Sequence, residues 1–390
     1  MDLTRRSVLG AAVASLASGT LAAPTRPCGA SAQSRFRAAI ADAAQTAIAG
    51  LGAPGISVAI ARHGKIQLEQ GFGLANLETA SPVTPRTVFR IGSLTKQFTA
   101  AAALRLQERG QLRLDDPVSK YLPIFAAHPR IAIAELINHT AGLHSEDEQT
   151  SGPVGPDGPP SQVVLASAIA AQKTLFDFPP GTAWLYSNAN YLLLGAIVEV
   201  VSGTPLASAL YELVLKHFAQ TTLALDRSDI VVRNRANGYS VGDDGRFSHA
   251  TFIEISNAGG AGAMRGSAVD LVRWHQALIG GKVMSEASFA FLTTAGRLRD
   301  GRLGGANRFS PDDSNYGDVQ YGGGLLLSPV GSRPRTISHN GFINGFSAVL
   351  ETNLDTGLSF AALANADVGP KLPFRAIRLA VRDLETRIPA

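Results

Sequence analysis

Ser93-Leu94-Thr95-Lys96 opens a long apolar stretch, QFTAAAALRLQER over residues 97–109, and this combination decides how the chain is interpreted. The alanine-rich run predicts a buried helix that Gly110 ends. Residues three apart share one face of a helix, so the Lys96 amine can reach the Ser93 hydroxyl. A lysine desolvated there loses its proton more readily and can help activate a serine nucleophile. The alternative is that Ser93 only caps the helix, and a serine three residues before a lysine is common by chance.

Two further motifs follow in a fixed order. Tyr186-Ser187-Asn188 is the only Tyr-x-Asn in the chain and precedes an apolar stretch at 191–198, and His339-Asn340-Gly341 lies in a segment with β character. The series Ser-x-x-Lys, Tyr-Ser-Asn and basic residue-x-Gly resembles the serine β-lactamase and penicillin-binding-protein superfamily. It is most similar to the branch of class C β-lactamases, DD-peptidases and related esterases, in which a Tyr-x-Asn triplet stands in the middle position.

Further segments extend this resemblance over nearly everything after about residue 35. They are Pro54 to Ile60, Gly71 to Ala75, Pro82 to Pro85, Leu136 to Leu143, Pro180 to Thr182 and the glycine-rich 259–262, which opens a helix. The resemblance implies an α/β (α+β) fold of the β-lactamase/transpeptidase-like type. It also implies a covalent acyl-enzyme mechanism.

The hydrophobic patterning independently predicts how such a fold is assembled. Residues 55–61 and 65–71 read as strands joined by a hairpin turn at 62–64, and β character returns at 336–349 and 357–364. Apolar side chains at helical spacing predict an amphipathic helix before Gly50, with Phe36, Ile40, Ala44 and Ile48 on its apolar face. The same spacing predicts a second amphipathic helix at the C-terminus, with Phe374, Ile377, Val381, Leu384 and Ile388 on one face. We therefore expect an antiparallel sheet built from both chain ends with flanking helices, and a mostly helical inserted lobe at about 115–250.

The resemblance assigns the catalytic roles to Ser93, Lys96 and Tyr186. Ser93 would attack an acyl carbon, and its backbone N–H would help to stabilise the oxyanion. An ammonium beside Tyr186 would lower the pKa of the phenol from its reference value near ~10. Lys96 and Tyr186 would titrate as a coupled pair, so the general-base role is assigned to them jointly.

Four residues are expected to bind substrate: Asn188, His339, Gly341 and Phe342. Asn188 would hold the substrate amide and the lysine nitrogen, Gly341 would let the substrate backbone approach, and Phe342 would contribute its N–H to the oxyanion hole. His339 departs from the Lys-Thr-Gly of β-lactamases. It would either anchor a substrate carboxylate when protonated, or relay protons and orient Tyr186. His139 is expected to be a buried structural histidine.

The first 32 residues predict an export signal that is removed by cleavage after Ala23 or after Ala32, and residues 33–390 are predicted to form the catalytic domain. Thr4-Arg5-Arg6-Ser7-Val8-Leu9 is a twin-arginine signature, and the alanine-rich run from Gly10 to Ala23 is too short and too polar for a membrane anchor. Cys28 is the only cysteine, so no disulfide is expected within the mature protein. We expect a bacterial periplasmic or secreted protein.

Composition excludes several other classes of function. The formal net charge is only +4 and no run of basic residues occurs, so we expect no nucleic-acid partner and no stable membrane anchor. The scattered histidines predict no metal and no cofactor. The sequence therefore predicts a serine hydrolase that acts on a small-molecule or peptide acyl substrate, through an amide or ester bond. The alternatives are a true class C-like β-lactamase, a carboxylesterase, a DD-peptidase and a non-enzymatic penicillin-recognising receptor.

Overall fold

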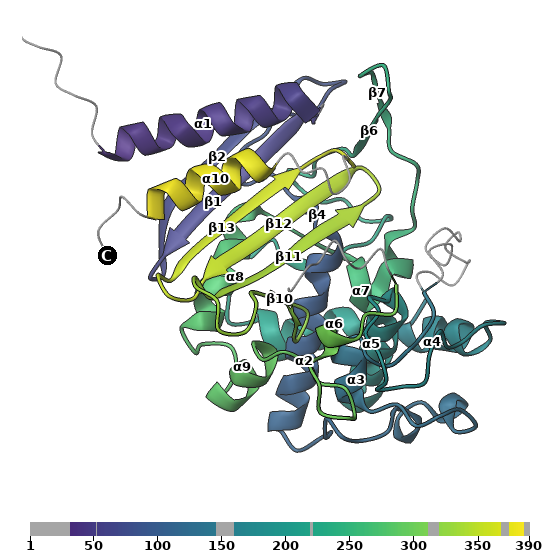
Figure 1. Cartoon of the computed structure of the whole chain (residues 1–390). Helices are drawn as coiled ribbons and strands as arrows, with labels where there is room; N and C mark the ends of the chain where they lie inside the picture. The colour runs from purple at the N-terminus through teal and green to yellow at the C-terminus, as the bar shows by residue number, and fades with distance from the viewer. Residues whose placement is uncertain are drawn as a thin grey trace, which may run out of the picture.

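An antiparallel eight-stranded sheet forms the centre of the molecule (Figure 1). The structure is a computed structural model that describes residues 32–51, 53–145, 160–218, 221–310, 320–367 and 374–385. The predicted export signal and Ile388 therefore lie outside the described residues. In spatial order the strands are β3 (Ser81–Pro82), β2 (Lys65–Asn76), β1 (Gly55–Arg62), β13 (Leu358–Ala364), β12 (Phe346–Asn353), β11 (Thr336–Ile343), β10 (Leu326–Leu327) and β9 (Gln320–Tyr321).

The sheet is built from both ends of the chain, as the sequence predicts. β1 and β2 form the expected hairpin, and its turn holds His63 and Gly64 at φ values of 50° and 76°. On its other side β1 pairs with β13, with Ile56 opposite Ala364. The β character predicted at 336–349 is confirmed, and Asn344 and Gly345 form a two-residue turn that divides this segment into β11 and β12. Asn-Gly is a strong signal for such a turn, since both positions tolerate positive φ.

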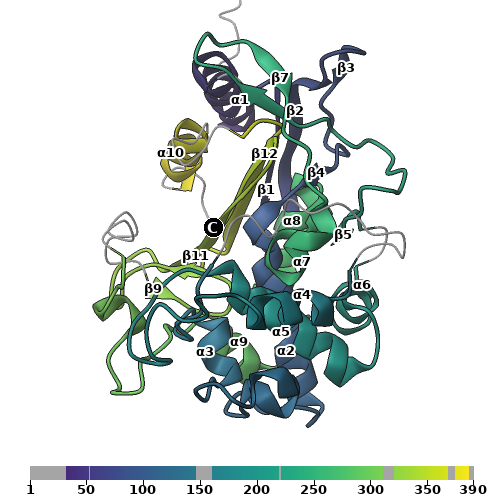
Figure 2. The same cartoon turned by 90° about the vertical axis from the view of Figure 1, so that its right-hand side faces the viewer.

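One face of the sheet is covered by the two terminal helices. α1 (Ala32–Leu51) and α10 (Phe374–Glu385) lie side by side on this face in both views (Figures 1 and 2). Phe36 and Ile40 of α1 and Phe374, Ile377 and Val381 of α10 are buried against alternate residues of the central strands, and together they form one core cluster. Alternate residues of a strand point to opposite faces, so the remaining positions of β1, β12 and β13 serve a second core.

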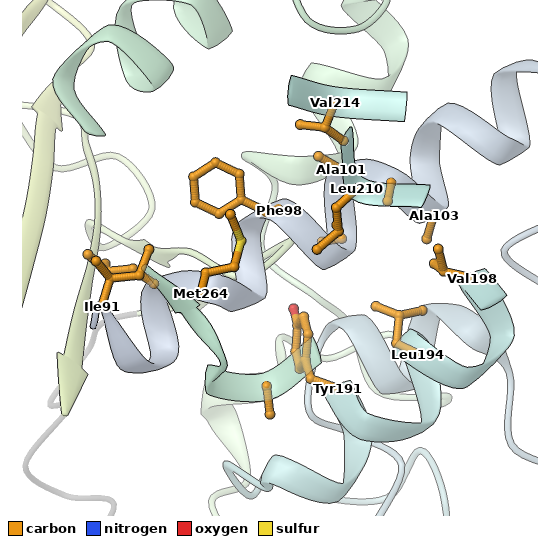
Figure 3. Close-up of a cluster of buried hydrophobic side chains, with 14 of the residues drawn as sticks. Ile91, Phe98, Ala101, Ala103, Tyr191, Leu194, Val198, Leu210, Val214 and Met264 are labelled. Carbon is orange, nitrogen blue, oxygen red and sulfur yellow. The ribbon is translucent and has the colours of Figure 1, made fainter. Parts of the chain in front are cut away.

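The second face packs against α8 (Ala268–Ile279) and, beyond it, α2 (Thr95–Glu108). α2 is buried around most of its circumference, and its buried side chains include the polar Thr95, Lys96, Gln97 and Thr99 beside the apolar ones. Figure 3 shows Phe98, Ala101 and Ala103 of this helix among side chains from several other elements. Those labelled neighbours are Tyr191, Leu194, Val198, Leu210, Val214, Ile91 and Met264.

The helical lobe lies beside the sheet and contains α3 (Ile133–Ile137), α4 (Gln162–Ala170), α5 (Asn188–Ser202), α6 (Leu206–Leu210) and a π-helical turn, η5 (Tyr211–Leu215). Its helices end earlier than the expected residue 250. β5 (Ala224–Leu225), β6 (Tyr239–Val241) and β7 (Phe247–His249) occupy the rest of that range. β5 joins β4 (Phe89–Arg90) and β8 (Met264–Gly266) in a small sheet of order β4-β8-β5, and β6 pairs with β7.

The remaining helices are α7 (Gly259–Gly262) and α9 (Glu286–Leu292), together with short 3-10 turns. Within the described parts of the chain, no single helix has the length and apolar character needed to cross a membrane. Only the bent pair of Asn188–Ser202 and Leu206–Leu215, with an angle of 80°, passes on length and composition.

Candidate active site

Ser93 lies in a tight turn immediately before α2. The turn is the 3-10 helix η1 (Gly92–Leu94), so Ser93 precedes the helix that the sequence assigned it to open. Gly92 has φ of +51°, and a Cβ there would lie 2.7 Å from both the backbone N and O of Phe342. Thr95 fixes the turn, because its hydroxyl donates to the Gly92 carbonyl at 2.7 Å and accepts the Met264 N–H at 3.0 Å. The backbone geometry therefore holds Ser93 against strand β11.

Lys96 is the second residue of α2, is fully buried and faces three oxygen atoms. Its Nζ lies 3.0 Å from Ser93 Oγ, 2.8 Å from Asn188 Oδ1 and 2.9 Å from the Ala261 carbonyl oxygen. Burial lowers the pKa of the amine well below its usual range. A neutral amine has two N–H donors and one lone pair. In that neutral form the two carbonyl oxygens, which can only accept, take both donors and leave the lone pair to the Ser93 hydroxyl, whereas an ammonium donates to all three oxygens.

Tyr186 completes this group from the segment that leads into α5. The centroid of its ring lies 4.7 Å from Lys96 Nζ, and its ring lies 6.0 Å from that of His339. The structure thus brings the three sequence-predicted catalytic residues together with Asn188, although they come from two elements far apart in the chain. A serine hydroxyl, a desolvated amine and a phenol in contact are the groups that acyl transfer needs.

His339 is buried and both of its ring nitrogens already have protein partners. Nδ1 lies 2.6 Å from the Asn340 carbonyl oxygen, which can only accept, so Nδ1 carries the proton. Nε2 then accepts from the Tyr321 hydroxyl at 3.0 Å. Burial, helped by the charge of Lys96, lowers the pKa of His339 to about 3. The expected alternative of a protonated carboxylate anchor does not agree with this setting, because the imidazole stays neutral.

Gly341 shares the buried face of β11 with His339, and its neighbour Phe342 is partly exposed. A Cβ on Gly341 would lie 2.0 Å from the Ile91 carbonyl oxygen. The expected reason for this glycine is therefore corrected: it allows the strand to approach the backbone before Ser93, whereas the sequence analysis assigned that space to substrate. The same approach brings the backbone of Phe342 against Gly92, as its predicted part in an oxyanion hole requires.

A family model described as Beta-lactamase matches residues 40–384. The chain belongs to the beta-lactamase family. Among its relatives are PbpX of Bacillus subtilis (strain 168), 32% identical over 61% of this chain and 58% of that protein, and Esterase EstB of Burkholderia gladioli, 36% identical over 40% and 43%. This beta-lactamase-family chain thus spans less than two thirds of the length of these curated relatives.

The solved structures with a similar fold include an amidohydrolase. The D-stereospecific amidohydrolase from a Streptomyces species is 28% identical, with a TM-score of 0.66 over 85% of this chain and 94% of that one. The likeness confirms the expected β-lactamase-like α/β fold.

Among the described residues, no group of three or more His, Cys, Asp and Glu side chains is placed to hold a metal ion.

Two residues of this beta-lactamase-family site were not assigned a part in it from the sequence. Tyr321 of β9 binds His339, and a two-residue strand with a single tyrosine gives no detectable pattern. His139 was expected to be structural, and it is fully buried with φ of +60°. Its Nδ1 accepts the Ser187 N–H at 3.3 Å and lies 2.9 Å from Asn190 Nδ2, and its ring centroid is 4.4 Å from that of Tyr186. His139 therefore holds the Tyr-Ser-Asn segment through its backbone and through the phenol ring.

Replacing His139 with alanine should lower kcat for acyl transfer about tenfold or more at a temperature where the variant is folded, because Tyr186 loses its support and small displacements are costly in catalysis. His275→Ala is the matched control. His275 is equally buried and is bonded through both ring nitrogens, to Thr352 Oγ1 and Gln97 Oε1, whereas His139 is bonded through Nδ1. It should lose comparable stability with kcat changed less than about threefold. Equal losses of kcat in steady-state assays of the two variants would show that His139 contributes only to folding.

Proposed function

We propose that this protein is a serine hydrolase that cleaves an amide or ester bond through a covalent acyl-enzyme. The observation that carries the proposal is the setting of Lys96, whose buried Nζ is held by two carbonyl oxygens at 2.8 Å and 2.9 Å and lies 3.0 Å from the Ser93 hydroxyl oxygen. Membership of the beta-lactamase family supports it. So do the names of two relatives, one an esterase and one an amidohydrolase.

In the proposed reaction, Ser93 Oγ attacks the acyl carbon while its proton passes to the Lys96–Tyr186 pair. The N–H groups of Ser93 and Phe342 stabilise the oxyanion of the tetrahedral intermediate. The same pair returns the proton to the leaving amine or alkoxide as its bond to carbon breaks. Water then attacks the ester to Ser93 and gives up a proton to the pair, which passes it to Ser93 Oγ as the bond between that oxygen and the acyl carbon breaks and the acid is released. Asn188 keeps the amine in register throughout, since its Oδ1 accepts one of the Lys96 N–H groups.

We further propose that the substrate is neutral near the scissile bond. A β-lactam or a peptide with a free carboxylate would need a cation where β-lactamases carry lysine, and the neutral His339 does not supply one. This argument favours an amide or ester substrate over a penicillin. The neutral imidazole instead packs against the ring of Tyr321, which in turn packs against the ring of Tyr186.

The test is intact-mass spectrometry after exposure to a fluorophosphonate or to a penicillin, combined with kinetics on an acyl ester, its matching amide and the penicillin. We expect fluorophosphonate labelling, and turnover of a neutral substrate with kcat/KM at least about tenfold above that for penicillin. Faster turnover of penicillin would instead identify a β-lactamase. That result would contradict the proposal of a neutral substrate. Persistent penicillin acylation without turnover would identify a penicillin-recognising receptor and would contradict the proposed hydrolase.

We also propose that the protein is exported by the twin-arginine route and works in the periplasm or outside the cell. The motif around Arg5 and Arg6 supports this, and it lies outside the described residues. Replacing both arginines with lysine should leave full-length precursor in the cytoplasm of a bacterial host, because the pathway reads the arginine pair. Fractionation and immunoblotting give the readout. Normal maturation of the double-lysine variant would rule this route out.

A further inference from the structure

A second cluster of charged side chains lies on the small sheet β4-β8-β5 and contains none of the candidate catalytic residues. Arg90 of β4 and Arg265 of β8 are directly opposite each other in the strand register. Arg235 is bridged to Val88, two residues before Arg90 and on the same face of that strand. All three guanidinium groups approach Asp226, which follows β5 and is only 1% exposed. Three cations thus meet at a single carboxylate.

The contacts of this cluster leave donors in excess of acceptors. Arg90 Nε donates to Asp226 Oδ2 at 3.1 Å, while Arg235 and Arg265 share Oδ1, the latter from 3.5 Å. Three further bonds use weaker acceptors: the Leu225 and Arg227 carbonyl oxygens and Ser228 Oγ. The Nε atoms of Arg235 and Arg265 are buried and have no hydrogen-bond partner among the described residues.

The charges are unbalanced as well as the donors. The side chains of Arg90, Arg235 and Arg265 are 17%, 27% and 16% exposed, so water screens them only in part. Like charges directly opposite in a sheet are destabilising, and cations removed from water need a counter-charge. The adjacent Arg227 is already bound to Asp229 at 2.6 Å and leaves the balance unchanged. The cluster therefore has a surplus of two positive charges.

The three arginines line a cavity of about 160 Å³ together with Asp226, Asn237 and the ring of Phe346. This volume is several times the ~30 Å³ that one water molecule occupies in the liquid. Guanidinium groups bind planar carboxylates and phosphates through paired N–H donors, which a halide ion cannot match. We propose that this cavity is a binding site for a small oxyanion, of the phosphate or carboxylate class, that is separate from the acyl-transfer site.

The first test is thermal unfolding of the full chain in phosphate, acetate or chloride at equal pH and ionic strength. A saturating oxyanion bound only by the folded state should raise Tm by about 3–5 °C beyond the value in chloride. The comparison of phosphate with acetate shows which oxyanion the site prefers. Arg265→Gln should abolish the extra shift. Equal Tm in all three salts, or an unchanged shift in Arg265→Gln, would overturn the proposal.

Asp226→Asn should increase the Tm shift caused by phosphate, whereas Arg265→Gln should abolish it. Without the carboxylate the cationic surplus rises, so the variant should be less stable in chloride yet gain a larger Tm shift from phosphate than the wild type. Asp355→Asn is the matched control, because Asp355 also bonds two arginines, Arg333 and Arg335, but does not line the cavity. It should lose stability in chloride without the added phosphate shift.

If Asp226→Asn does not fold, isothermal titration of phosphate into the wild type and Arg265→Gln decides the question. We expect saturable binding by the wild type and at least about tenfold weaker binding by the variant, since one charged bidentate partner is lost. Identical isotherms for the two proteins would overturn the proposed site.

Discussion

Ser93→Ala should lower kcat/KM for acyl substrates by about 10⁴-fold or more and abolish labelling by a fluorophosphonate. The hydroxyl is the group to which the acyl group is transferred, and its oxygen lies 3.0 Å from Lys96 Nζ. The fold should remain intact, because Ser93 is the N-cap residue of neither η1 nor α2, whose N-caps are Ile91 and Leu94. Intact-mass spectrometry and steady-state kinetics on the purified variant give the two readouts.

Ser187→Ala is the matched control for this substitution. Ser187 is a buried serine in the same site, and its Oγ has no hydrogen-bond partner among the described residues. Removing this oxygen should change kcat/KM by less than about threefold. If a folded Ser93→Ala protein were acylated at the wild-type rate, or if Ser187→Ala alone lost labelling, the proposed nucleophile would be wrong.

The free energy of unfolding should fall steeply once the pH drops below about 6.5. Three histidines, His139, His275 and His339, are fully or almost fully buried. Burial lowers the pKa of His275 and of His339 to about 3, and that of His139 well below its usual range. In the unfolded chain the same groups bind protons near pH 6.5. Between these values the unfolded state binds more protons, so stability is present above pH 6.5 and is lost as the pH falls.

The slope identifies the histidines as the cause. His275 and His339, which take up protons only on unfolding in this range, give roughly 3 kcal/mol per pH unit between pH 6 and 4.5, and His139 acts in the same direction before the carboxylates contribute. Urea unfolding at half-unit pH intervals measures this slope. His275→Gln should reduce it by about 1.4 kcal/mol per pH unit, since one titrating group is gone. A free energy of unfolding that stays constant from pH 7 to 5 would show that these imidazoles titrate alike in the folded and unfolded chain.

Local signals in the sequence were sufficient for much of the fold. The hairpin at His63 and Gly64, the amphipathic terminal helices and the buried helix after Ser93 each follow from a pattern within one segment. The turn at Asn344 and Gly345 carried an equally local signal that the sequence analysis did not use. Patterns of this kind were predictable because the residues that interact are neighbours in the chain.

The missed features depend on residues that meet only in the folded chain. Gly341 had to be a glycine because of the Ile91 carbonyl, some 250 positions away, and no periodicity reports such a contact. The state of His339 depends on its burial and on Tyr321. Its reference pKa near ~6.5 therefore gave no guide to its charge in the site.

The pairing of β1 with β13 also has a consequence for how the chain reaches its fold. These strands lie side by side at the centre of the sheet, but Ile56 and Ala364 are separated by about 300 residues. A growing chain therefore presents the β1–β2 hairpin with one unpaired edge until almost the last strand has been synthesised, and such edges recruit other chains. Folding must then be slow and largely post-translational, because closing so long a loop precedes any gain from the central contacts. During that interval the hairpin edge is where a chaperone would be needed and where aggregation would begin.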